Sequence, residues 1–169
     1  MNNNLIIINL TRFIALILMQ ALVFKRIAFA NTNIFIYPIF IMLLPAEIPS
    51  ALAIAISFVF GISLDFFYDS PGIHAGTCVF TAFLRYYLLG FMEPKGGYPL
   101  NSAPTKSKLG IPWFLRYSSI FMLVHLFIYF SIEAFSLVYI TTILAKTCLS
   151  FIFSMVFVTI YQFLLDPKE

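Results

Sequence analysis

Residues 51–85 read ALAIAISFVFGISLDFFYDSPGIHAGTCVFTAFLR, two apolar runs separated by a short polar segment. Each run approaches the roughly 20 apolar residues that a helix needs to cross a hydrocarbon core about 30 Å thick. Between them, residues 70–72 (Ser-Pro-Gly) form a turn signal, because Pro fixes one backbone dihedral angle and Gly accepts a positive one. The stretch therefore predicts two membrane helices joined by a tight turn.

The composition of the whole chain agrees with this assignment. Of its 169 residues, 62% are hydrophobic and 10% are charged, and the mean hydropathy is +0.98. Soluble domains carry about 25% charged residues, and a chain this short has too little interior to hide so many apolar side chains from water. The net charge of +3 is spread along the chain and forms no basic stripe of the kind a nucleic-acid-binding protein needs.

Six apolar runs follow one another along the chain, namely residues 5–24, 34–44, 51–64, 73–92, 111–131 and part of 135–165. The second run is short, carries Pro38 and ends at the break that Pro45 opens. Such segments form broken or re-entrant helices where protein shields the freed backbone groups. In the last run, residues 135–142 are expected to form a loop or turn before a helix beginning near Ile143. We predict an all-α integral membrane protein, a compact bundle of six transmembrane helices, with five as the alternative count.

The chain is expected to form one transmembrane domain over residues 1–169, interrupted by a polar connection at residues 93–112. This connection holds four prolines and three glycines and no apolar periodicity, so we expect a mobile loop. Its lysines at positions 95, 106 and 108 predict a cytoplasmic location, because short positively charged loops stay on that side. With six spans, both termini are then cytoplasmic, whereas Lys25 and Arg26 fall on the opposite side.

The polar residues of the opening stretch have competing interpretations. Asp65 and Asp69 are four positions apart, so on a continuous helix they share one face. The favoured interpretation makes them interfacial groups that cap the turn, and the alternative makes them groups that hold a partner or an internal cation. His74 opens the next helix, where a structural hydrogen bond is a better expectation than metal binding.

Arg85 follows His74 by eleven positions, about 16 Å along a helix, so both side chains point to nearly the same side. The arginine either snorkels to the cytoplasmic face or faces the interior and pairs with Glu47 or a backbone carbonyl. Glu133 and Lys146 fall near the proposed outer face. Together with the two aspartates and the histidine they can form an outer polar cluster, in which Lys146 is expected to pair with an aspartate.

The residues do not predict an enzyme or a cofactor. An intramembrane aspartyl protease needs two carboxylates that converge from different helices, whereas Asp65 and Asp69 share one short segment. The sequence has no Ser–His arrangement, phosphate-binding loop or zinc-binding H-E-x-x-H pair. Cys78 and Cys148 lack C-x-x-C spacing and are expected to be separate thiols.

The chain resembles the MreD family, small membrane proteins of the bacterial rod-shape (cell-elongation) system. The resemblance rests on Tyr37-Pro38, Leu44-Pro45, Gly61-x-x-x-Asp65, Gly72-x-His74-Ala75 and Ala82-Phe83-Leu84-Arg85. Relatives usually have proline after the arginine, where this chain has Tyr86. The resemblance implies a bacterial inner-membrane scaffold that works with MreC, MreB, RodA and a class B penicillin-binding transpeptidase in lateral wall synthesis. It also implies similarity to the six-helix substrate-binding subunits of energy-coupling-factor vitamin transporters.

These expectations combine into one functional hypothesis. Specific association in lipid depends on close packing and a few polar pairs, and the candidate helix-packing residues are Gly61, Gly72, Gly76, Pro38 and Pro45. We expect residues 61–85 to bind the transmembrane helix of an MreC-like partner through these residues and the charged groups. The alternative is a small-molecule-binding membrane subunit of a vitamin-type transporter, which would need a polar-lined outer pocket. Whether the protein is a monomer or a homodimer stays open.

Overall fold

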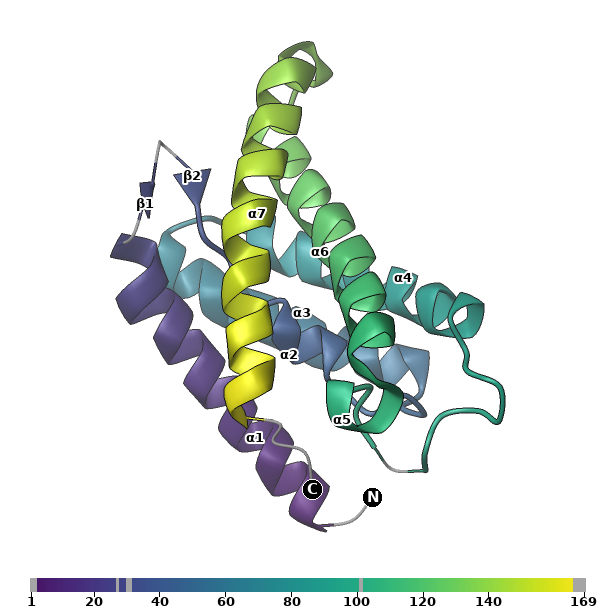
Figure 1. Cartoon of the computed structure of the whole chain (residues 1–169). Coiled ribbons are helices and arrows are strands. Elements are labelled where there is room, and N and C mark those ends of the chain that lie inside the picture. The colour runs from purple at the N-terminus through teal and green to yellow at the C-terminus, as the bar shows by residue number, and fades with distance from the viewer. Residues whose placement is uncertain (1–2, 27, 30–31, 101, 166–169) are drawn as a thin grey trace.

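The computed structural model describes residues 3–26, 28–29, 32–100 and 102–165. Five long helical stretches dominate the fold (Figure 1): α1 (Asn3–Leu18), continued by a π-helical turn η1 (Met19–Val23) and a 3-10 turn η2 (Phe24–Arg26), then α3 (Ser50–Tyr68), α4 (Ile73–Phe91), α6 (Ile111–Ala134) and α7 (Ile140–Leu165). The shorter elements are α2 (Ile39–Met42), α5 (Lys106–Leu109), the 3-10 turn η3 (Leu137–Tyr139) and the paired strands β1 (Ala28–Phe29) and β2 (Thr32–Asn33).

Four of the helical stretches within the described residues are long and apolar enough to cross a membrane: Ile6–Arg26, α3, α6 and α7. The protein is therefore an all-helical, multi-pass membrane protein, as its composition predicts. The remaining long helix, α4, equals α3 in length with 19 residues, but it carries more polar side chains. Most of these polar side chains are buried among the neighbouring helices.

The turn between α3 and α4 forms where the sequence predicts it. Asp69 ends α3 in the left-handed conformation with φ 52°, and Gly72 precedes α4 with φ 88°. A Cβ atom on Gly72 would meet nothing within 4 Å, so this glycine serves the turn and packs against no other helix among the described residues. Gly76 has only an ordinary contact, because its added Cβ would lie 3.7 Å from Ile132.

The fold has two helical hairpins, α3–α4, which is closed by a tight backbone contact, and α6–α7, which is closed by a second turn. A Cβ on Gly61 would lie 2.5 Å from the Cα of Ala75, which no side chain can tolerate without moving a helix. Gly61 therefore has the helix-packing position expected of it. In the second hairpin, α6 ends at Phe135 (φ 48°) and α7 begins at Ile140, a few residues earlier than predicted. Figure 1 shows α6 and α7 side by side over the α3–α4 pair.

The second apolar run, residues 34–44, contains only a short helix, as its length and Pro38 suggest, and is not among the described helices long enough to span a membrane. Its helical part, α2, has four residues and a length of about 6 Å, too short to cross a membrane. All eleven residues are buried, and they form the centre of the hydrophobic core. We call residues 34–44 the core segment. Pro38 starts its one-turn helix and Pro45 follows its end.

The core segment runs through the interior of the bundle beside α1. Its first residue contacts Gln20 of η1 and Leu43 contacts Arg12 of α1, eight residues earlier in that helical stretch. Eight helical residues correspond to about 12 Å, so the segment runs antiparallel to α1 through the interior. It connects the turn end of the molecule, which holds residues 69–72 and 135–139, with the loop end, which holds residues 45–49 and 93–110.

The connection at the loop end is bonded to the ends of the neighbouring helices. Trp113 donates from Nε1 to the carbonyl of Met92 over 2.8 Å, and the Tyr98 hydroxyl donates to the carbonyl of Leu89 over 2.7 Å. Lys106, in the short helix α5, is buried and lies 4.9 Å from the ring centroid of Phe163 near the end of α7. The predicted loop therefore contains a short helix and extends only to Gly110, because α6 begins at Ile111.

Candidate functional site

The core segment has irregular backbone inside a membrane protein, so its peptide groups need partners from elsewhere. Gln20 provides two of them from the π-helical turn of the first span. Its side-chain Nε2 donates to the carbonyl of Ile34 over 3.0 Å, and its Oε1 accepts the amide of Ile36 over 2.9 Å. The side-chain amide of Gln20 offers both a donor and an acceptor. It therefore bonds the backbone at the start of the core segment in the way that a neighbouring β-strand would.

Helix α7 serves the same stretch of backbone with two serines one turn apart. The Ser154 hydroxyl accepts the amide of Phe35 over 2.9 Å, and the Ser150 hydroxyl donates to the carbonyl of Asn33 over 2.8 Å. Both serines are fully buried. Sequence reasoning missed them and Gln20, although an amide in the middle of a span and two serines at helical spacing in an apolar helix are recognisable signals.

The far end of the core segment is held by three longer side chains. Tyr117 of α6 donates to the carbonyl of Met42 over 3.2 Å, and Arg12 of α1 donates to that of Leu43 over 3.2 Å. Arg85 of α4 donates through Nη2 to the carbonyl of Leu44 and, over 3.3 Å, to that of Pro45. The carbonyls at the C-terminal end of a helix in a soluble protein bind water. Here the side-chain donors take the place of that water.

Arg85 is inside the bundle, bonded to backbone carbonyls as one of the two sequence interpretations expects. Its side chain is 3% exposed, and its Nε atom is buried without a hydrogen-bond partner. Within the described part of the chain, no carboxylate oxygen lies within 4.0 Å of its guanidinium nitrogens. The helix continues past Arg85, and Tyr86 is 62% exposed.

Asp65 caps the start of α4 from the preceding helix. Its Oδ1 accepts the amide of His74 over 2.9 Å and its Oδ2 accepts the amide of Ala75 over 3.0 Å. The first amides of a helix have no partner within the helix, and a carboxylate also stabilises the positive end of the helix dipole. Asp65 is thus a capping group, whereas Asp69 is exposed and its backbone ends α3.

The neighbours of Asp65 superficially suggest a Ser–His–Asp triad. Ser70 and Asp65 both approach the same nitrogen of His74, Nδ1, at 2.9 Å and 3.0 Å. A catalytic relay requires the serine and the carboxylate on opposite nitrogens of the imidazole. The other nitrogen of His74, Nε2, is buried without a partner among the rings of Tyr37, Tyr68 and Tyr129. Asp65, Ser70 and His74 therefore form a helix cap and lack the geometry of a catalytic proton relay.

The second histidine has a comparable structural environment. His125 of α6 lies between the hydroxyls of Thr81, 3.1 Å from Nδ1, and Tyr37, 2.8 Å from Nε2. It thereby connects α4, α6 and the core segment. In the regions that the structure describes, no three His, Cys, Asp or Glu side chains come together in a way that could hold a metal ion.

Glu133 and Lys146 form an ion pair at the turn end, and the predicted pairing of Lys146 with an aspartate is wrong. The Lys146 Nζ lies 3.1 Å from the Glu133 Oε2, and both side chains are about one-third exposed, at 35% and 33%. The pair joins α6 to α7. Asp65 and His74 instead make their own contacts between α3 and α4, so the described residues contain two separate polar groups where one outer cluster was expected.

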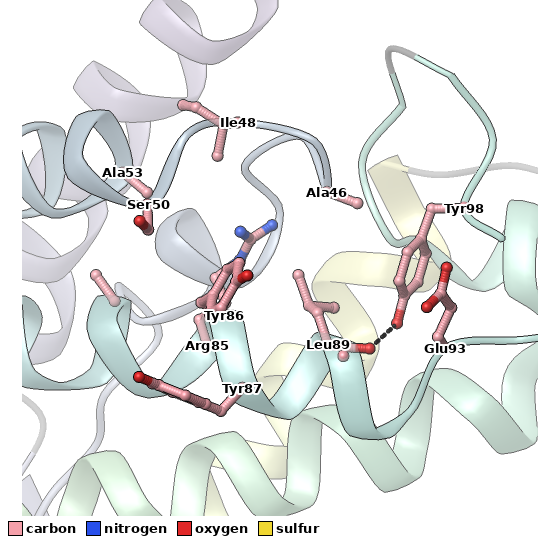
Figure 2. A pocket seen from close by; sticks show the side chains of 12 residues that line it. Ala46, Ile48, Ser50, Ala53, Arg85, Tyr86, Tyr87, Leu89, Glu93 and Tyr98 are labelled. Atoms are coloured by element: carbon pink, nitrogen blue, oxygen red, sulfur yellow. Dashed lines mark hydrogen bonds between the residues drawn. The ribbon is translucent and has the colours of Figure 1, made fainter.

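A cavity of about 480 Å³ opens at the loop end beside Arg85 (Figure 2). Its polar lining residues are Ser50, Arg85, Tyr86, Tyr87, Glu93 and Tyr98, and its apolar residues come from the 46–53 region and from α4. Burial raises the pKa of Tyr98 to about 12, so its phenol remains a hydrogen-bond donor. We call this the loop-end cavity.

A second hollow lies on the other side of Ile48, which lines both. This apolar groove, also about 480 Å³, is formed by α1, the core segment and α3, with side chains that include Leu10, Phe13, Phe40 and Ile56. A polar cavity and an apolar groove therefore adjoin at the loop end. No family model, curated protein or solved structure matches this chain.

Proposed function

We propose that this protein is a non-catalytic scaffold of the bacterial inner membrane, similar to MreD, and that it binds an MreC-like partner. The sequence resemblance over residues 37–85 supports the family. The observation that supports the scaffold role most strongly is that the polar side chains in this stretch form bonds within the protein. Asp65 and His74 are buried and bonded to each other, and the side chains of Asp65 and Arg85 bond neighbouring backbone groups, so these residues stabilise the shape of the bundle.

The same geometry moves the proposed partner contact to the outer faces of α3 and α4. Gly61 brings the two helices together, and the Asp65 cap fixes the turn between them. The result is a stiff hairpin whose outward side chains include Phe66 (83% exposed) and Phe83 (46% exposed). In lipid, apolar contact with a partner gains little over contact with lipid, so a fixed, well-fitting shape determines specificity.

The proposed topology has six passes through the bundle, with the core segment as the second pass. The basic loop end and both termini are then cytoplasmic, following the lysines at positions 95, 106 and 108. Contacts with MreB, RodA and the class B transpeptidase are proposed to be indirect, through the MreC-like partner. A bundle with six passes also retains the proposed similarity to the energy-coupling-factor subunits.

A vitamin-binding transport subunit is the weaker candidate for a geometric reason. Such a subunit needs a polar pocket that opens to the outside. The loop-end cavity, which has the polar lining described above, lies beside the basic connection and is cytoplasmic in the proposed topology. The scaffold is therefore the function that the geometry supports better.

Photocrosslinking tests the scaffold proposal. A photoreactive amino acid replaces Phe66 or Phe83 in cells that also produce an MreC-like protein, and Val156, exposed on α7, provides the matched control position. We expect the MreC-like protein to be captured from position 66 or 83 and not from 156. Equal capture from all three positions, or none from 66 and 83 in a folded protein, would contradict the proposal.

A further inference from the structure

Arg85 carries a charge that its surroundings do not neutralise. Its guanidinium donates from Nη2 to the carbonyl oxygens of Leu44 and Pro45, and Nε is buried without a partner. Charged side chains within membrane segments pair with an opposite charge or with backbone carbonyls, or they face a polar cavity. Arg85 lines such a cavity and, within the described residues, has no carboxylate within 4.0 Å. An anion in the loop-end cavity would supply the opposite charge that the two carbonyls do not.

The N-terminus of α3 borders the same cavity, where Ser50 and Ala53 line it. This 19-residue helix begins at Ser50, and Pro49 before it provides no side-chain cap. The first intrahelical bond runs from the amide of Ala53 to the carbonyl of Pro49, so the preceding amides have no partner within the helix. Helix N-termini bind phosphate through such amides and through the helix dipole. Figure 2 shows Ser50 and the Arg85 guanidinium lining one cavity.

The groove beside the cavity identifies the kind of anion. Ile48 lines both hollows, so a polar site adjoins a groove lined by Leu10, Phe13 and Phe40. A molecule that fills both has an anionic head and an apolar tail. Arginine pairs well with phosphate through its planar fork of donors. We propose that the loop-end cavity binds the phosphate of a membrane phospholipid, whose acyl chain lies in the apolar groove.

Glu93 limits the charge of this ligand. It also lines the cavity, but it is exposed, and Figure 2 shows it beside Tyr98 with Leu89 between it and the guanidinium. Its carboxylate would repel a second negative charge at that end of the cavity. A head group with one phosphate therefore fits better than one with several.

Gly90 permits a test that leaves the Arg85 bonds intact. It lines the cavity, and a Cβ added there meets nothing within 4 Å, so Gly90→Phe places a ring in the cavity and Gly90→Ala is the matched control. Arg85→Lys keeps the charge and removes the planar fork. Native mass spectrometry of the delipidated full chain measures binding of dioleoyl phosphatidylglycerol, with dioleoylglycerol and inorganic phosphate as separate probes.

We expect the wild type and Gly90→Ala to bind one phosphatidylglycerol, with affinities that agree within about twofold, and Gly90→Phe and Arg85→Lys to lose about tenfold or more. Dioleoylglycerol should bind at least about tenfold more weakly than the phospholipid. Unchanged phospholipid binding in folded Gly90→Phe would overturn the proposal, as would equal binding of dioleoylglycerol. Displacement of the lipid by micromolar phosphate would identify a free-anion site and overturn the lipid assignment. None of these outcomes depends on the MreC-like partner.

Discussion

Gly61 and Asp65 lie one helical turn apart on α3, and each accounts for one part of the contact with α4. Gly61 has no side chain, so the backbone of Ala75 can approach it, and Asp65 bonds the second and third amides of α4, those of His74 and Ala75. The sequence predicts both as structural, since small residues permit close packing and a carboxylate before a helix caps it. What it could not predict is that Arg85 remains buried without an ionic partner, because that depends on where the core segment ends.

Gly61→Ala tests the close contact. The added Cβ would lie 2.5 Å from the Cα of Ala75, so α3 and α4 must separate. We expect a loss of about 1–3 kcal/mol in the free energy of unfolding, measured by denaturation in detergent. Gly90→Ala is the control, because its Cβ meets no atom within 4 Å and should leave stability equal or slightly raised. Equal stability of both variants would contradict the packing role of Gly61.

Asp65→Ala tests the cap. The substitution leaves the amides of His74 and Ala75 without their acceptor, and we expect a loss of about 1–3 kcal/mol in the free energy of unfolding. Asp69→Asn is the control, since Asp69 is exposed and asparagine tolerates its left-handed backbone. The same denaturation measurement should show little change for the control. A larger effect at position 69 than at 65 would mean that the wrong aspartate has been assigned as the cap.

Among the elements, the core segment is the one that apolar patterning describes least well. A run of eleven apolar residues is equally compatible with burial in lipid and burial in protein. Such a run has no polar face, so its periodicity cannot distinguish the two environments. The structure places it within protein, as a one-turn helix between irregular stretches. The turn at residues 70–72 and the membrane helices α3, α6 and α7 follow from local sequence, whereas the partners of the core segment come from helices far away in the chain.

Gln20→Leu tests how this element is stabilised. Leucine fills similar space but leaves the carbonyl of Ile34 and the amide of Ile36 unpaired inside the bundle. We expect a loss of about 2–4 kcal/mol in the free energy of unfolding. Met19→Leu, at a lipid-facing neighbour that is 37% exposed, should have almost no effect. If leucine at position 20 leaves the denaturation midpoint in place, the side-chain amide does not support the core segment.

On the scale of the whole molecule, polar side chains from several helices converge on one irregular segment and leave the lipid-facing surface apolar. Composition predicts the membrane class, and the lysines of the loop predict an orientation. The core segment explains why an apolar chain retains Arg12, Gln20 and Arg85 within or near its spans: they bond backbone groups that no water reaches.

The orientation can be tested by cysteine labelling in a Cys148→Ser background. Lys95→Cys lies in the loop end and Ser136→Cys in the turn between α6 and α7. With a membrane-impermeant maleimide, we expect Ser136→Cys to react in intact spheroplasts and Lys95→Cys to react only after permeabilisation. The reverse pattern would place the basic loop outside and contradict the proposed topology.

Hydrogen–deuterium exchange of residues 34–44 in lipid nanodiscs tests the central claim most directly, namely that an irregular segment crosses the interior with its backbone bonded to neighbouring side chains. The account predicts that the amides of Phe35 and Ile36 exchange as slowly as those in the middle of α3, and that Gln20→Leu accelerates Ile36 while leaving α3 unchanged. Rapid exchange of both amides in the wild type, at the rate of the exposed residues Lys95 and Gly96, would contradict it.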